Sequence, residues 1–175
     1  MPERLNSTKQ IAIQGWIETT LGISAIWTDQ NSLRPALPYI SINIIAGPQL
    51  DGTPQRTYKT TNIFTYLYRK VFTLSIQSFS NTNHLALLSD LINSITLPSK
   101  AGILKAAGLA VYNNTSISPT NISELINTGI EKRGSIDVTM AYAEEVDDPT
   151  GEIIKTNVSG ISGTKFENVN TDIEI

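Results

Sequence analysis

The stretch AIWTDQNSLRPALPYISINII, Ala25 to Ile45, sets two short apolar runs on either side of a polar bridge that cannot be helical. Pro35 and Pro38 lack an amide donor, and each pushes the residue before it towards extended geometry. Asp29 and Asn31 are turn formers whose side chains can bond nearby backbone. The stretch therefore predicts two short strands joined by a stiff connection.

Two segments carry apolar residues at the three- and four-residue spacing of an amphipathic helix. Gly22 is placed to end the first helix, and Pro98 ends the second. Residues 100–107 are expected to add one or two further turns. The candidate caps are Asn6 or Ser7 for the first helix and Thr82 or Asn83 for the second, and the apolar stripes are Ile13, Trp16, Ile17 and Leu21, then Leu85, Leu88, Ile92 and Ile95.

Alternation of apolar and polar residues predicts strands over residues 23–27, 39–45, 63–79, 109–112 and 135–143. Gly47 and Pro48 are expected to end the second of these, which leaves a long loop to about Thr61. Residues 122–126 are expected to form a brief helix, and residues 153–158 a strand. The segment after Gly160 is expected to be a loosely ordered extension.

These elements predict one α+β domain over residues 1–175, with a mixed, mostly antiparallel sheet packed against two main helices. Each strand has one apolar face, and these faces together form the core side of the sheet. The predicted core residues are Ile42, Ile44, Phe72, Leu74, Ile76, Ile136, Val138 and Met140 of the sheet, with Ile13, Ile17, Leu88 and Ile92 of the helices.

The composition argues against an enzyme. The chain has 175 residues, no cysteine, one histidine and a net charge of −3, so it can form neither a thiolate zinc site nor a site with two histidines. His84 is expected to have a capping or surface role at the start of a helix. We expect no catalytic residue, no cofactor and no bound metal. The N-terminus lacks the apolar core of a signal peptide and no segment is apolar enough to span a membrane, so we expect no membrane association.

Two charged patterns have more than one interpretation. The acidic run from Glu144 to Asp148 could bind a divalent cation, but it lacks the spacing of a calcium loop, which favours a solvated turn between strands. Tyr58, Tyr66 and Tyr68 lie among basic residues, a pattern found in nucleic-acid-binding proteins. In an acidic chain, an amphipathic hairpin whose tyrosines pack against a neighbour is the favoured alternative.

The order of features along the chain resembles the neck or tail terminator proteins of tailed bacteriophages and prophages. A helix ending WIETTLGI is followed by AIWTDQNSLRPALPYISINIIAGP, VFTLSIQSFS, a helix ending LP, AAGLAVYN and IEKRGSIDVTMAYAEEV. The most specific parts are the WTDQN bridge with RPALPY, and the strand KRGSIDVTMAYA. The resemblance covers roughly residues 11–159.

The resemblance implies a structural protein of the virion that is assembled in the cytoplasm of the bacterial host. Such terminators form a ring, usually of six subunits, at the head-proximal end of the tail. The ring ends polymerisation of the tail tube, binds the head-completion or connector protein, and contacts the sheath if the tail is contractile. DNA passes through its lumen without specific binding. The alternative is another non-enzymatic tail module of the same fold, such as a tail-completion or tube-like protein.

A stiff polar bridge and a long loop are surfaces that a neighbouring subunit or neck protein could contact. For the bridge, the alternative is an ordinary connection that lets two strands change position in the sheet. The candidate interface residues are Trp27, Asp29, Gln30, Arg34, Arg56, Lys59, Tyr66 and Tyr68, and the candidate residues lining the lumen are Glu144, Glu145, Asp147 and Asp148.

Overall fold

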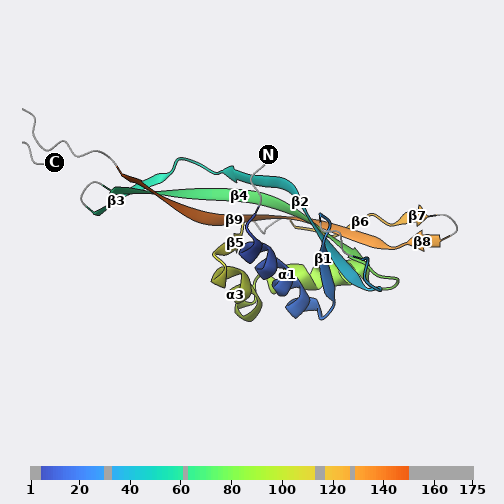
Figure 1. Ribbon diagram of the computed structural model, residues 1–175. Helices are drawn as coiled ribbons and strands as arrows, with labels where there is room; N and C mark the ends of the chain where they lie inside the picture. Colours follow the sequence, from blue (N-terminus) through green and yellow to red (C-terminus); the bar gives the residue numbers. More distant parts are fainter. Residues whose placement is uncertain (1–4, 30–32, 61–62, 113–116, 127–128, 150–175) are drawn as a thin grey trace, which may run out of the picture. The chain divides into compact units, whose positions relative to one another are not determined.

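A computed structural model of the chain describes residues 5–29, 33–60, 63–112, 117–126 and 129–149 (Figure 1). It divides into two compact units. Unit 1 comprises Met1–Pro54 and Tyr68–Glu144, and unit 2 comprises Gln55–Leu67 and Glu145–Ile175. The prediction of a single domain over residues 1–175 stays a prediction.

Three helices lie in unit 1: α1 (Ser7–Leu21), α2 (His84–Ser94) and α3 (Pro98–Ala106). The predicted signals at the ends of α1 are confirmed. The Asn6 side chain accepts a hydrogen bond from the amide of Lys9 at 3.0 Å, as an N-cap does. Gly22 has φ of 68°, a left-handed conformation that suits glycine, and its amide donates to the carbonyl of Glu18.

A mixed sheet of seven strands confirms the α+β class. Its main strands are β1 (Ser24–Trp27), β2 (Tyr39–Leu50), β4 (Ile63–Phe79), β9 (Arg133–Pro149) and β5 (Leu109–Val111), in the order β1-β2-β4-β9-β5. β1 is parallel to β2, and the other described pairings are antiparallel. The short strands are β3 (Gln55–Thr60), which pairs with β4, β6 (Thr120–Asn121), which pairs with β9, and a separate hairpin of β7 (Glu124–Ile126) and β8 (Gly129–Glu131).

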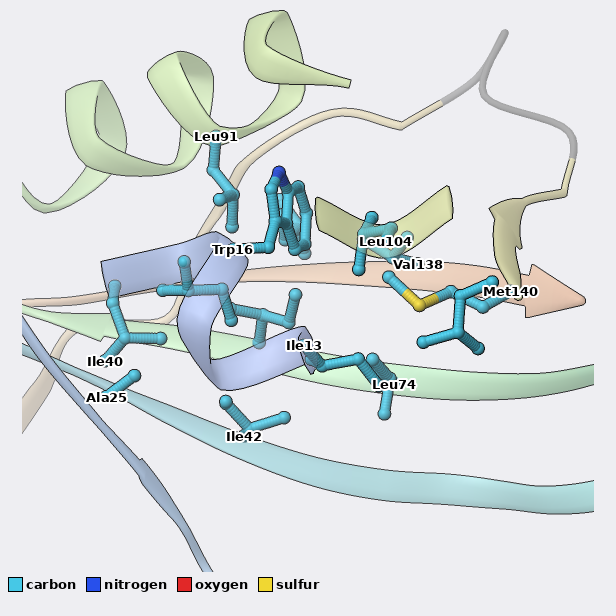
Figure 2. Close-up of a cluster of buried hydrophobic side chains, with 14 of the residues drawn as sticks. Ile13, Trp16, Ala25, Ile40, Ile42, Leu74, Leu91, Leu104, Val138 and Met140 are labelled. Atoms are coloured by element: carbon cyan, nitrogen blue, oxygen red, sulfur yellow. The ribbon is translucent and has the colours of Figure 1, made fainter. Parts of the chain in front are cut away.

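The helices of unit 1 cover one face of the sheet (Figure 1), and the predicted core lies between them. Ten of the twelve predicted core residues are buried, while Ile44 and Ile92 are partly buried and pack against the same cluster. Trp16 is fully buried beside Leu91 of α2 (Figure 2) and donates from its indole Nε1 to the Ser94 hydroxyl at 3.0 Å. The predicted register of β2, β4 and β9 is therefore confirmed.

Hydroxyl and amide side chains dominate the opposite face of the sheet in unit 1. Thr73 and Thr139 are hydrogen bonded across β4 and β9 at 3.2 Å, and Ser75 and Ser135 at 3.4 Å. No described helix covers this face, so polar side chains that bond to each other are the stable solution there.

The region from residue 46 to residue 61 differs from the predicted loop. β2 continues to Leu50, because Gly47 and Pro48 fall in a shift of register between Ala46 and Gln49 where neither is paired with β4. The missing amide of Pro48 therefore costs no hydrogen bond of the ladder. β3 then forms a hairpin with the first half of β4 where the glycines and prolines predicted a loop, and this hairpin carries Tyr58 and Tyr66, as the favoured interpretation of the tyrosine pattern expected.

Two other predictions were wrong. Residues 122–126 form no helix: the amide of Ile122 donates to the carbonyl of Arg133, and Glu124–Ile126 pairs with β8. A helix of this length is only marginally stable, whereas the hairpin gives the same backbone amides and carbonyls hydrogen-bond partners. The acidic run Glu144–Asp148 is not a turn but part of β9. The predicted strand over 153–158 and the extension after Gly160 lie outside the described residues.

Candidate assembly surfaces

One arginine of the bridge between β1 and β2 packs against the sheet. The guanidinium carbon of Arg34 lies 5.4 Å from the ring centre of Tyr39 and 5.3 Å from that of Phe79. These two rings are buried and stacked on each other at 4.6 Å with an angle of 5° between their planes. Arg34 also forms an ion pair with Glu131. The polar bridge is therefore held by a cation–π contact and a charge pair at the same time.

A second arginine completes this group. Arg133 lies 5.5 Å from the ring centre of Phe79 and pairs with Glu131 at 3.0 Å and with Glu124 at 2.9 Å. We call Arg34, Tyr39, Phe79, Glu131 and Arg133 the arginine–aromatic cluster. Several shared partners make such a network more rigid than one exposed ion pair.

The predicted interface residues of the bridge have different environments. Trp27 is only 2% exposed and belongs to the core, so it offers no surface in this chain. Asp29 is exposed, and Gln30 lies outside the described residues. The sequence reasoning missed Leu33, which is 95% exposed. An apolar residue just before Arg-Pro in a polar bridge was the available signal.

The hairpin of β3 and β4 in unit 2 has an aromatic side. The register places Arg56 opposite Tyr66 and Tyr58 opposite Phe64, so these four side chains share one face. The Arg56 guanidinium carbon lies 3.5 Å from the Phe64 ring centre, and Tyr58 meets the same ring edge-on at 5.3 Å. Tyr58 is 60% exposed, and Tyr66 is half-buried. We call this group the aromatic face of unit 2.

The other side of unit 2 is charged and internally paired. Asp147 accepts hydrogen bonds from the Lys59 ammonium and from the Thr65 hydroxyl, each at 2.7 Å. These bonds, first that of Lys59 and then that of Thr65, lower the pKa of Asp147. The hydrogen bond to Asp147 in turn raises the pKa of Lys59. Lys59 thus joins β3 to β9 within unit 2.

The pair has a defined dependence on pH. The carboxyl pKa of Asp147 is lowered on folding, so its contribution is complete above the ordinary value of about 4 and is lost as the pH falls through the lowered pKa. The raised pKa of Lys59 gives a contribution that is present below about 10.4 and is lost as the pH rises through the raised value. The pair is therefore intact throughout the neutral range.

Replacing Lys59 by methionine is expected to raise the pKa of Asp147 towards its ordinary value, because the largest cause of the shift is removed. Thr65→Val should raise it by less. Carboxyl carbon chemical shifts followed by NMR against pH measure both changes. An unchanged Asp147 pKa in Lys59→Met would contradict this pairing.

The four acidic residues predicted to line a lumen are not equivalent. Glu144, in unit 1, forms an ion pair with Lys70 at 2.6 Å. Asp147, in unit 2, is bonded to Lys59, while Glu145 and Asp148 are exposed. The lysine partners therefore offset part of the charge that the sequence alone suggested. Tyr68, the last predicted interface residue, is half-buried in unit 1.

No chemical site emerges in the part of the chain that the structure describes. Within it, no group of three histidine, cysteine, aspartate or glutamate side chains could hold a metal ion. His84 is the first residue of α2 and is half-buried, and neither ring nitrogen has a hydrogen-bond partner. None of the described helices is both long and apolar enough to cross a membrane.

The sequence model of a family described as phage neck terminator protein matches residues 10–168, which include most of α1, every described strand and both surfaces above. A comparison with curated proteins finds no match.

Proposed function

This chain belongs to the phage neck terminator protein family, and we propose that it forms a ring, a homohexamer, at the head-proximal end of the tail. As a member of this family it is a structural protein of the phage neck. In the proposed role the ring ends polymerisation of the tail tube and joins the tail to the head-completion or connector protein. In a contractile tail it also contacts the last ring of sheath. The family match over residues 10–168 is the observation that carries the proposal.

Two structural features support a role in assembly. A ring needs two different complementary surfaces on each subunit. The aromatic face of unit 2 exposes Tyr58 beside a stacked arginine, a composition that is enriched where proteins bind each other. The bridge exposes Leu33 beside a rigid network. These surfaces belong to different elements and are not copies of each other.

The charge of the chain supports passage of DNA without specific binding. Each chain carries a net charge of −3, so a ring of six would carry −18. Tight binding to phosphates requires several unpaired lysines or arginines. Here Lys59, Arg69 and Arg133 each pair with a carboxylate. We propose that no cofactor or metal takes part and that the subunits assemble in the host cytoplasm.

Deleting the gene from the phage that encodes it tests the proposal. Electron microscopy should show filled heads without tails together with tubes of irregular length, because nothing caps the growing tube. Supplying the intact chain from a plasmid should restore joined particles, and an antibody label should lie at the neck. Joined virions of uniform tail length from the deletion, or a label at the far end of the tail, would overturn the proposal.

A further inference from the structure

An apolar groove lies between α3 and β5. These two elements lie at one edge of the sheet of unit 1 (Figure 1). Its volume is about 560 Å³, several times the volume of a leucine side chain. The side chains that line it are almost all apolar and come from the end of α2, from α3 and from β5. They include Ile95, Pro98, Ala101, Leu104, Leu109 and Val111.

The groove borders an open edge of the sheet. β5 is the last strand in the order, and in the described part of the chain no strand pairs with its outer edge. Tyr112 donates its amide to Thr139 on β9, so by antiparallel alternation the backbone of Val111 points away from β9. An extended segment placed here could bond to this edge and place apolar side chains in the groove.

The bridge offers an exposed apolar segment, with no turn or bend at residues 33–35 and a bend at residues 36–38. Leu33 is 95% exposed and Leu37 is 42% exposed. Arg34 lies between them, and its stacking on Tyr39 and its ion pair with Glu131 hold the segment in place before any partner binds. Pro35 restricts the backbone further. Because the segment is already held in place, little conformational entropy is lost when the exposed Leu33 side chain is buried on binding.

A copy of the chain cannot fill its own groove. Arg133 of the arginine–aromatic cluster and Ala141, which pairs with the middle of β5, are both on β9. They are eight residues apart, which corresponds to roughly 26 Å along a strand. Leu33 sits beside this cluster, so it is too far from the groove of the same copy.

We propose that the Leu33–Leu37 segment of one copy binds in the α3/β5 groove of a second copy. Lys105 lines the groove and exposed Asp29, of opposite charge, precedes the segment, while the positive charge of Arg34 within the segment is already paired with Glu131. Each copy has one segment and one groove, so the contact is head-to-tail and can propagate around a ring. The inference rests on the proposed ring and identifies the contact between its subunits.

Disulfide cross-linking in virions tests this contact, because the native chain has no cysteine. We would build Leu33→Cys with Gly102→Cys into the phage and oxidise purified virions. Gly102 belongs to the groove, and a Cβ there meets nothing within 4 Å. The expected result is a ladder of multiples of the chain on a non-reducing denaturing gel. The matched control pairs Ile11→Cys with Gly102→Cys, since Ile11 is 70% exposed but lies on α1; it should stay monomeric.

The outcomes separate this inference from the proposed function. If virions carry the variant protein at the neck but the gel shows only monomer, the proposed contact is wrong and the proposed neck role is unaffected. A cross-link to a different protein would also overturn it. Absence of the protein from virions would contradict both the proposed contact and the proposed neck function.

A blocking variant provides a second test that does not depend on cysteine chemistry. Gly102→Trp should fill the groove, and Gly102→Ala should leave it open. We expect the first to abolish assembly at the neck and the second to have no effect, with the same circular dichroism spectrum for both. Normal necks from Gly102→Trp would contradict the proposed contact.

Discussion

Replacing Trp16 by alanine is expected to lower the free energy of unfolding by about 3–5 kcal/mol, the usual cost of removing a large buried aromatic side chain. Trp16 is fully buried (Figure 2), and it joins α1 to α2 through the hydrogen bond from its indole to Ser94. The change removes both the packing and the bond, in the centre of the core of unit 1. A loss of this size is a large fraction of the stability of an ordinary domain.

Urea denaturation followed by far-ultraviolet circular dichroism measures this loss. Fluorescence is less suitable, because the chain has only two tryptophans and the variant removes one. Ser94→Ala is the matched variant: it keeps the indole but leaves the buried indole N–H without a partner, which should cost about 1–3 kcal/mol. A loss below about 1 kcal/mol for Trp16→Ala would mean that the indole is not packed as described.

The elements that the sequence predicted well depend on signals within a few residues. The ends of α1 follow from Asn6 and Gly22, whose hydrogen bonds reach three or four residues along the chain. The core faces of β2, β4 and β9 follow from strict alternation. In these segments local preference and tertiary packing agree, so one sequence was sufficient to predict them.

The errors occur where a distant segment provides the partner. β2 passes Gly47 and Pro48 because a shift in its register with β4 leaves both unpaired. β3 is a different case, because its partner is the adjoining start of β4, and Gly52 and Pro54 before it favoured a loop. The acidic end of β9 is strand rather than turn in part because Lys59, 88 residues away, bonds to Asp147. Such long-range pairings leave no local pattern in one sequence.

The candidate surfaces were predicted in part for the same reason. The bridge was recognised as stiff from its prolines, but the role of Arg34 depends on Glu131 and Phe79, which are distant in sequence. Trp27 was predicted as an interface residue, but the parallel pairing of β1 with β2 places it in the core. Exposure of Leu33 could not be read from residue type, because most leucines are buried.

Replacing Arg56 and Tyr58 together by alanine is expected to stop heads from joining tails while the chain still folds. Tyr58 is 60% exposed, and the Arg56 guanidinium lies on the ring of Phe64, so both side chains are available to a neck partner. Buried tyrosine and arginine anchors each contribute about 2 kcal/mol or more to binding. Losing two should therefore weaken docking by roughly a thousandfold. Particle counts by electron microscopy and infectious titre measure the effect.

The opposite side of the same strand supplies the control. Gln55 and Thr57 are exposed and alternate with Arg56 and Tyr58 along β3, so their side chains point away from the aromatic face. Gln55→Ala with Thr57→Ala removes a similar exposed surface from β3 and should leave joining normal. Both double variants should keep the native free energy of unfolding within about 0.5 kcal/mol per substitution, as exposed positions do. If both double variants join heads to tails equally well, the aromatic face is not the docking surface. If joining is lost only in the Arg56/Tyr58 variant, docking is assigned to the aromatic face, because all four positions are exposed and lie on the same strand.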